Sequence, residues 1–232
     1  KAERASKARA DFLSTVSHEL RTPLNAINGI TYLLLQEKPK VSQLNYLKSL
    51  EFSGNYLLNF INDILEINRL ESDKVVLEKI NFNLPELTEN IVTSFKEFIH
   101  ENNIKCHLNI DKSINYNLKG DPTKLSQILI NLLNNAIKFS KNGDVWCNII
   151  KKSETTNNVT LYFEIKDNGI GIPKDKQDAI FDSFSQGSVE INRTYGGTGL
   201  GLSIVKKILE LMGSQIHLYS ESGKGSTFSF EL

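Results

Sequence analysis

The sequence predicts a helical hairpin followed by an α/β two-layer domain, in which helices cover one face of a mixed sheet. Apolar residues recur in steps of three and four up to about residue 68, as they do in helices that pack side by side. Beyond Glu71, alternating stretches are interleaved with helical patterns, and two strand-like stretches, QIHLYSE and STFSFEL, close the chain. We therefore expect a hairpin over residues 1–72, a linker with a first strand over 73–80, and a second domain over 81–232.

The predicted hairpin contains two heptad seams joined by the polar segment QEKPKVSQ. The first seam consists of Leu13, Val16, Leu20, Pro23, Ile27, Ile30 and Leu34, and the second of Leu47, Leu50, Gly54, Leu57, Ile61, Ile64 and Asn68. A single hairpin cannot bury apolar faces of this width. We therefore expect two copies to form a dimeric four-helix bundle, so that the protein is a homodimer.

The second domain reads as strands alternating with helices. The expected strands are residues 74–84, 104–110, 145–152, 159–166, 215–221 and 226–232, and the expected helices are residues 85–100, 123–139, 174–184 and 200–212. Such alternation, ending in a hairpin of strands, is typical of a mixed sheet layered against helices.

Composition excludes several classes of protein. The 232 residues include 27 basic and 27 acidic side chains, and this balance argues against a nucleic-acid or membrane-surface protein. No apolar run approaches the about 18 residues of a membrane span. The chain begins with Lys1 and lacks the apolar core of a signal peptide, so we expect a piece of a longer protein. Cys106 and Cys147 cannot form a disulfide framework, which favours a cytosolic setting.

His18 lies on the first helix, in the stretch FLSTVSHELRTPLNAI, and away from the seam. With Val16 and Leu20 at core positions, His18 is about 200° around the helix from each of them. The ring therefore points away from the bundle core. Two interpretations remain, an ordinary surface histidine and a reactive group. His100, His107 and His217 lack metal-ligand spacing, and we interpret them as structural.

The neighbours of His18 favour a reactive group. Glu19 can accept a proton from one ring nitrogen, which leaves a lone pair on the other and makes it more nucleophilic. Thr22 lies one turn further along the same face. Pro23 removes a helical hydrogen bond and permits a bend.

Asn131, Asn135 and Lys138 follow one another at steps of four and three on the helix 123–139, so they share one face. Polar groups on a mostly buried helix are costly without partners. A magnesium ion and a triphosphate would supply partners, because amide oxygens suit a hard cation and lysine suits phosphate oxygens. The alternative is a polar helix surface.

Two glycine-rich segments follow. In IKDNGIGIP, Asp167 ends a strand, Gly169 and Gly171 permit close backbone approach to a flat ligand, and a buried carboxylate can accept hydrogen bonds from an amine such as that of adenine. In SQGSVEINRTYGGTGLG, residues 185–201 lead into a helix whose N-terminus favours phosphate, with Arg193 as a further contact. The alternatives are a tight turn and a disordered surface loop. The usual phosphate loop is absent, because Gly225 stands where Ser or Thr must follow the lysine.

The run SHELRTPL resembles the phosphoacceptor motif of sensor histidine kinases of two-component systems. The helix with its two asparagines, IKDNGIGIP, IFDSF and GGTGLG resemble, in order, the N box, first glycine box, phenylalanine box and second glycine box of that family's ATP-binding domain, which has the Bergerat or GHKL-type fold. The resemblance covers essentially the whole chain. It implies that His18 is autophosphorylated, that Glu19 assists as a base, and that Thr22 positions water when the partner is dephosphorylated.

The resemblance also implies the nucleotide site. Asn135 would be the main Mg²⁺ ligand with Asn131 close by, Asp167 would hold the adenine of ATP, and Thr227 would lie near the adenine pocket. The remaining implied nucleotide-binding residues are Lys138, Gly169, Gly171, Ile172, Phe184, Arg193, Gly197, Thr198, Gly199, Leu200 and Gly201.

The function expected from the resemblance is that of a kinase core. It passes the phosphoryl group from His18 to an aspartate of a response regulator receiver domain, and phosphatase activity on that regulator is left open. We expect a cytoplasmic location, no nucleic-acid partner, and membrane contact only through sensor regions outside this chain.

Two rival functions are a GHKL-type ATPase clamp and a pseudokinase dimerisation scaffold. Gyrase and the related chaperone ATPases resemble this domain but carry a glutamate one turn before the magnesium-binding asparagine. Here that position is Asn131, and an amide cannot take a proton from water. The sequence therefore favours a kinase over an ATPase. A scaffold would need no nucleotide, yet every nucleotide motif is present.

Overall fold

The computed structural model describes residues 2–71, 75–183 and 198–232. The chain divides into two compact units. Within the described residues, the first unit comprises residues 2–71, 75 and 198–200, and the second comprises 76–183 and 201–232. None of the helices in these ranges is both long and apolar enough to cross a membrane.

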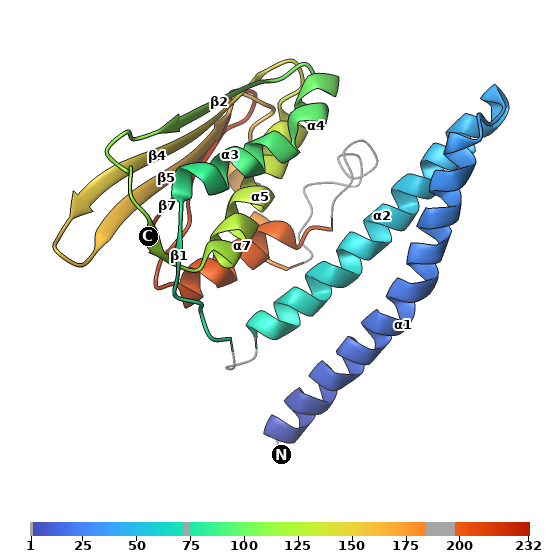
Figure 1. Cartoon of the computed structure of the whole chain (residues 1–232), viewed down its shortest axis with the longest axis horizontal. Helices are drawn as coiled ribbons and strands as arrows, with labels where there is room; N and C mark the ends of the chain where they lie inside the picture. Colours follow the sequence, from blue (N-terminus) through green and yellow to red (C-terminus); the bar gives the residue numbers. More distant parts are fainter. Residues whose placement is uncertain (1, 72–74, 184–197) are drawn as a thin grey trace. The chain divides into compact units, whose positions relative to one another are not determined.

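The first unit is a hairpin of two long helices, α1 (Ala2–Gln36) and α2 (Val41–Leu70), as Figure 1 shows. Helix α1 continues through Pro23. The Asn28 side chain donates a hydrogen bond to Asn55 Oδ1 at 2.9 Å. At Gly54 the two helices approach so closely that a Cβ atom would overlap the Asn28 side chain. A larger residue at position 54 would therefore displace the Asn28 side chain.

The predicted seams of the hairpin remain about half uncovered in a single chain. The exposed seam residues are Leu20, Ile27, Ile30, Leu34, Leu50 and Leu57. Exposed apolar surface of this extent indicates an interaction surface.

The second unit contains a five-stranded mixed sheet. The strands lie in the order β2 (Lys105–Ile110), β4 (Asp144–Glu154), β5 (Val159–Asp167), β7 (Gly225–Glu231) and β6 (His217–Glu221). Strands β2 and β4 run parallel, and every other neighbouring pair in this sheet is antiparallel. A separate antiparallel pair is formed by β1 (Ile80–Phe82) and β3 (Leu118–Gly120).

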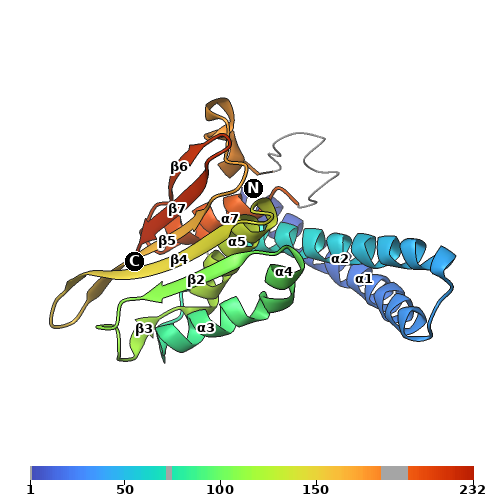
Figure 2. The ribbon, with the colours of Figure 1, turned by 90° about the horizontal axis from the view of Figure 1, so that it is seen from above.

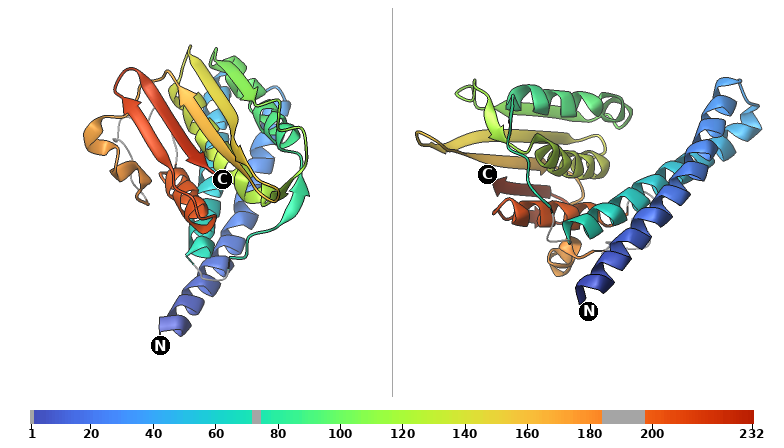
Figure 3. Two further views of the ribbon diagram at one scale, coloured as in Figure 1. Left: turned by 90° about the vertical axis from the view of Figure 1, so that its left-hand side faces the viewer. Right: turned by 60° about the horizontal axis from the view of Figure 1, so that its bottom comes forward.

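Helices cover one face of this sheet, as Figures 2 and 3 show. They are α3 (Leu84–Ser94), α5 (Pro122–Phe139) and α7 (Gly201–Leu211), and the short α4 (Lys96–Glu101) follows α3. Asp121 caps α5 by accepting the Lys124 N–H at 2.8 Å. Fully buried side chains from α5, α7 and the strands form the core, including Phe163 and Phe230, whose rings stack at 4.8 Å. The predicted fold class, a hairpin followed by a two-layer α/β domain, is confirmed.

The structure differs from the predicted elements in three places. The strand expected over 74–84 is reduced to β1, because its partner β3 offers only three residues. The helix expected over 85–100 is interrupted at Phe95, which separates α3 from α4. The helix expected near 174–184 is replaced by two 3₁₀ turns, η1 (Lys174–Lys176) and η2 (Ala179–Phe181), and residue 184 lies outside the described residues. So short a segment forms no independent helix.

Candidate functional site

The imidazole of His18 is open to solvent on α1, with 78% of its side chain exposed. The nearest carboxylate is that of Glu19, whose Oε1 lies 3.8 Å from Nδ1. A carboxylate on this side favours the tautomer with the proton on Nδ1, which leaves a lone pair on Nε2. The Thr22 hydroxyl donates to the His18 carbonyl oxygen at 3.3 Å. The ring therefore combines exposure with an acid that can take up its proton.

Asn131 and Asn135 lie on the half-buried face of α5. The Asn131 amide nitrogen donates to the Gln127 carbonyl at 2.8 Å, so its Oδ1 is the atom left for other partners. This Oδ1 faces the start of α7, because a Cβ atom at Gly201 would lie 2.6 Å from it. The fold thus brings Asn131 of α5 to the first residue of α7.

Lys138 lies one turn beyond Asn135 on α5 and is partly buried. Its Nζ lies 4.8 Å from the centre of the Phe139 ring. Burial lowers the pKa of the Lys138 ammonium. An anionic ligand would favour the charged form of this side chain.

Asp167 is the last residue of β5 and is 5% exposed. Its Oδ1 accepts two backbone N–H groups, from Gly169 at 2.9 Å and from Ser226 at 3.2 Å. Neither of these backbone donors contacts Oδ2. Burial raises the pKa of Asp167, and the two backbone donors oppose this rise. One oxygen is therefore anchored, and the other is left for a ligand donor.

The loop after Asp167 is fastened to its surroundings by close backbone packing. A Cβ at Gly169 would overlap the Phe139 carbonyl, and one at Gly171 would overlap the Glu221 carbonyl. Gly171 also has a φ of 63°, which favours glycine. The Ile172 N–H donates to Ser220 Oγ at 2.8 Å. The chain's own backbone therefore requires these glycines, and their approach to a flat ligand stays a prediction.

Two serines that the sequence analysis did not select lie near Asp167. Ser226 is buried and its N–H donates to Asp167, whereas the next residue, Thr227, pairs with Lys166 in β5. Because side chains alternate along a strand, Thr227 belongs to the opposite face of the sheet from Ser226. The alternation in STFSFEL places Ser226 on the same face of the strand as Phe228, the core face, but does not show that it lies beside Asp167. The second serine is Ser140, which ends α5 and is 1% exposed.

The remaining predicted residues fall in two groups. Thr198, Gly199 and Leu200 belong to the first unit, where Thr198 Oγ1 accepts the Leu200 N–H at 3.2 Å. Phe184, Arg193 and Gly197 lie outside the described residues. In the second unit, Asn131 thus lies next to Gly201. Asp167 contacts the loop that contains Ile172.

Two family models match the chain. Residues 8–73 match the His Kinase A (phospho-acceptor) domain. Residues 120–232 match the family described as histidine kinase-, DNA gyrase B-, and HSP90-like ATPase.

Comparison with known proteins also finds histidine kinases. The signal transduction histidine-protein kinase BarA of Escherichia coli is 39% identical over 232 residues, which is all of this chain and 25% of BarA. The solved full-length ShkA in complex with AMPPNP is 31% identical with a TM-score of 0.75, over 95% of this chain and 45% of that one.

The histidine kinase ThkA provides two further structures. Its catalytic domain is 30% identical with a TM-score of 0.55, over 67% of this chain and 95% of that one. ThkA in complex with the response regulator protein TrrA is 26% identical with a TM-score of 0.63, over 99% of this chain and 64% of that one.

The chain therefore belongs to the sensor histidine kinases of two-component systems. It spans about a quarter of the length of the curated relatives it matches first.

Proposed function

We propose that this chain is an ATP-dependent protein-histidine kinase core that phosphorylates its own His18. The observation that carries the proposal is an exposed imidazole with a carboxylate 3.8 Å from its Nδ1, within the part of the chain that matches a phosphoacceptor domain. The same chain contains a domain of an ATPase-like family, whose buried Asp167 keeps one carboxylate oxygen for a ligand.

The proposed step transfers one phosphoryl group. The lone pair on His18 Nε2 attacks the γ-phosphorus of ATP, a nitrogen–phosphorus bond forms, and the bond to the β-phosphate oxygen breaks to release ADP. The proton on Nδ1 passes to the carboxylate of Glu19, the acid that lies beside it. Glu19 thereby keeps the phosphorylated ring from retaining a positive charge.

The chain's residues fit a magnesium–nucleotide complex. Asp167 Oδ2 would accept the exocyclic amine of adenine, Asn131 Oδ1 and Asn135 would hold Mg²⁺, and Lys138 would contact phosphate. The fit rests on the orientation of Asn131, which leaves an amide oxygen beside Gly201. When bound, Mg²⁺ neutralises charge on the β- and γ-phosphates. Phe184, Arg193, Gly197, Thr198, Gly199 and Leu200 belong to the proposed set through resemblance alone.

Asn131 also decides between transfer and hydrolysis. A general base one turn before Asn135 would activate water, but an amide cannot accept the proton. The phosphoryl group is therefore kept for His18. This argument disfavours the ATPase clamp.

We propose three further features on the same basis. The exposed seam of the hairpin pairs with a second copy, and ThkA, which has been solved with a response regulator protein, suggests an aspartate of a receiver domain as the acceptor. Residues 1–72 form the dimerising phosphoacceptor domain, 73–80 the linker and 81–232 the catalytic domain. Because the reaction consumes ATP, the core faces the cytoplasm.

The test is incubation with ATP labelled at the γ-phosphate. We expect label on the protein that is lost in acid and stable in base, as a phosphoramidate is. His18→Gln should abolish the label while ATP binding stays unchanged, because His18 and the nucleotide residues lie in different domains of the sequence. Steady phosphate release without labelled protein would instead identify an ATPase.

A further inference from the structure

The chain contains three Asn-Gly pairs, Asn28–Gly29, Asn142–Gly143 and Asn168–Gly169. An asparagine before glycine can lose its side-chain nitrogen as ammonia, because a glycine without a Cβ lets its backbone nitrogen reach the side-chain carbonyl carbon. This nitrogen must first lose its proton, and the backbone must be free to turn. All three pairs carry the same groups, so the structure decides which of them reacts.

The first pair is protected by its helix. Asn28 lies inside α1, where the Gly29 N–H is bonded to the carbonyl four residues earlier. The Asn28 side chain also donates to Asn55 Oδ1 at 2.9 Å. Attack by the Gly29 nitrogen would therefore disrupt α1 and its contact with α2.

The third pair is protected by charge and packing. The Gly169 N–H donates to the Asp167 carboxylate at 2.9 Å, so loss of its proton would set two negative charges side by side. The Gly169 backbone also packs against the Phe139 carbonyl. Asn168 Oδ1 accepts the Asp144 N–H at 2.7 Å, which fixes the side chain that would be attacked.

The second pair lies in the turn between α5 and β4, where Asn142 is exposed. The Gly143 N–H donates to the uncharged Ser140 carbonyl at 3.0 Å. The Asn103 side chain donates to Asn142 Oδ1 at 3.2 Å. A donor in this position stabilises the negative charge that develops on the oxygen when its carbon is attacked. This pair therefore combines access to water with an activated carbonyl group.

We propose that Asn142 is a site of spontaneous deamidation. The Gly143 nitrogen loses its proton to hydroxide and attacks the Asn142 side-chain carbonyl carbon, so that a carbon–nitrogen bond forms. The side-chain nitrogen takes up a proton from water and leaves as ammonia. Water then opens the resulting succinimide ring at either carbonyl, which gives aspartate or isoaspartate. The reaction requires no nucleotide and is therefore independent of the proposed function.

Isoaspartate would add an extra carbon to the backbone of a turn that joins several elements. The Asn142 N–H donates to the Asn102 carbonyl at 3.1 Å, and the Gly143 carbonyl accepts the Lys105 N–H at 2.9 Å. These hydrogen bonds connect the turn to the end of α4 and to the start of β2. We therefore expect the modified chain to melt at a lower temperature than the fresh chain.

The test is incubation of the whole chain in mildly alkaline buffer, followed by tryptic peptide mapping with mass spectrometry. The three asparagines fall in separate peptides, residues 22–40, 142–151 and 167–174. We expect the mass increase of an amide-to-acid conversion in peptide 142–151 and no such increase in the other two. In urea, which removes the fold, all three peptides should convert at comparable rates. Protein digested before incubation corrects for conversion during the digest.

Asn142→Gly is the matched control for the effect on stability. Glycine adopts the φ of 55° found at this position and has no side chain to react. Incubation should lower the melting temperature of the wild type and leave that of Asn142→Gly unchanged. Conversion first at Asn28 or Asn168, the same selectivity in urea, or no conversion at Asn142 in the folded chain would each overturn the inference. An equal effect of incubation on both melting temperatures would overturn it too.

Discussion

At the scale of single residues, Asp167 combines a burial penalty with a proposed binding role. Burial raises the pKa of Asp167 in the folded state, so its ionisation weakens the folded state. The penalty is absent below the ordinary aspartate pKa of about 3.9 and complete once the pH exceeds the raised folded value. Above the raised folded value the ligand-free domain therefore bears this penalty in full.

We expect Asp167→Asn to raise the melting temperature of the ligand-free protein at neutral pH. The amide oxygen can still accept the N–H groups of Gly169 and Ser226, while the charge is removed. Its NH₂ group would then face the adenine amine, donor against donor, so ATP binding should weaken by at least about tenfold. Thermal melts with and without ATP measure both effects. A variant that is less stable without ATP and binds ATP normally would contradict this account.

At the scale of elements, packing within the hairpin depends on one glycine. Gly54→Ala places a Cβ against the Asn28 side chain, so we expect a loss of about 1–3 kcal/mol in the free energy of unfolding. Gly29→Ala is the control, since Gly29 lies in α1 with nothing within 4 Å of the added atom. It should gain up to about 1 kcal/mol from helix propensity. Denaturant unfolding distinguishes the two, and equal effects would argue against a close approach at Gly54.

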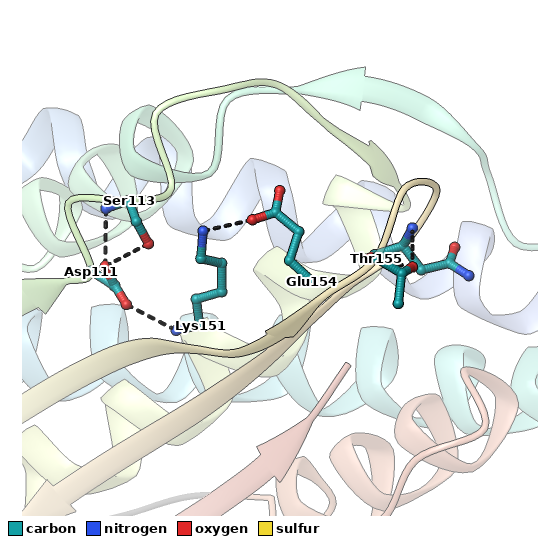
Figure 4. Close-up of polar contacts among 6 residues, drawn as sticks. Asp111, Ser113, Lys151, Glu154 and Thr155 are labelled. Carbon is teal, nitrogen blue, oxygen red and sulfur yellow. Dashed lines mark hydrogen bonds and ion pairs between the residues drawn. The ribbon is translucent and has the colours of Figure 1, made fainter.

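A second element, the end of β2, is fastened to β4 by Asp111 (Figure 4). Asp111 accepts the N–H and hydroxyl of Ser113 at 2.9 and 2.8 Å, and its other oxygen accepts the Lys151 N–H at 3.3 Å. The hydrogen bonds from Ser113 are the main reason why the pKa of Asp111 is lowered. A lowered folded pKa adds stability above the ordinary aspartate value, and this stability is lost as the pH falls through the folded value.

We therefore expect Asp111→Ala to lower the melting temperature near neutral pH, with the difference from wild type shrinking in acid below the ordinary aspartate pKa of about 3.9. Asp178→Ala, at an exposed aspartate before η2, is the control and should show no such trend. Melting curves across the acid range measure both variants. A difference in melting temperature that grows in acid would contradict a lowered pKa of Asp111 in the folded state.

At the scale of the whole molecule, the exposed seam predicts self-association. Ile30 lies on the seam and is 59% exposed, whereas Tyr32, off the seam, is 58% exposed. We expect Ile30→Glu to dissociate the dimer and Tyr32→Glu to leave it intact, because only the first places a charge in the bundle core. Analytical ultracentrifugation at micromolar concentration reads the outcome. A wild-type monomer would refute the predicted bundle.

Much of the fold was predictable because its signals are local. The heptad seams led to the two helices, and alternation led to β2, β4, β5, β6 and β7. The length of β1 was not predictable, since it depends on β3, a strand far along the chain. The family and the fold class are confirmed, while the site residues and the domain boundaries stay predictions.

The order of residues alone was enough to predict the chemistry that we propose for this chain. The evidence consisted of short-range patterns: a histidine beside a glutamate, an asparagine in place of a general base, and glycine-rich segments after a strand. Such patterns can be recognised in the sequence without a structure. Tertiary structure alone revealed that the Ser226 N–H donates to Asp167, and that the Phe139 carbonyl packs against Gly169. Burial and hydrogen-bond partners depend on which distant segments pack together, and no local pattern records that.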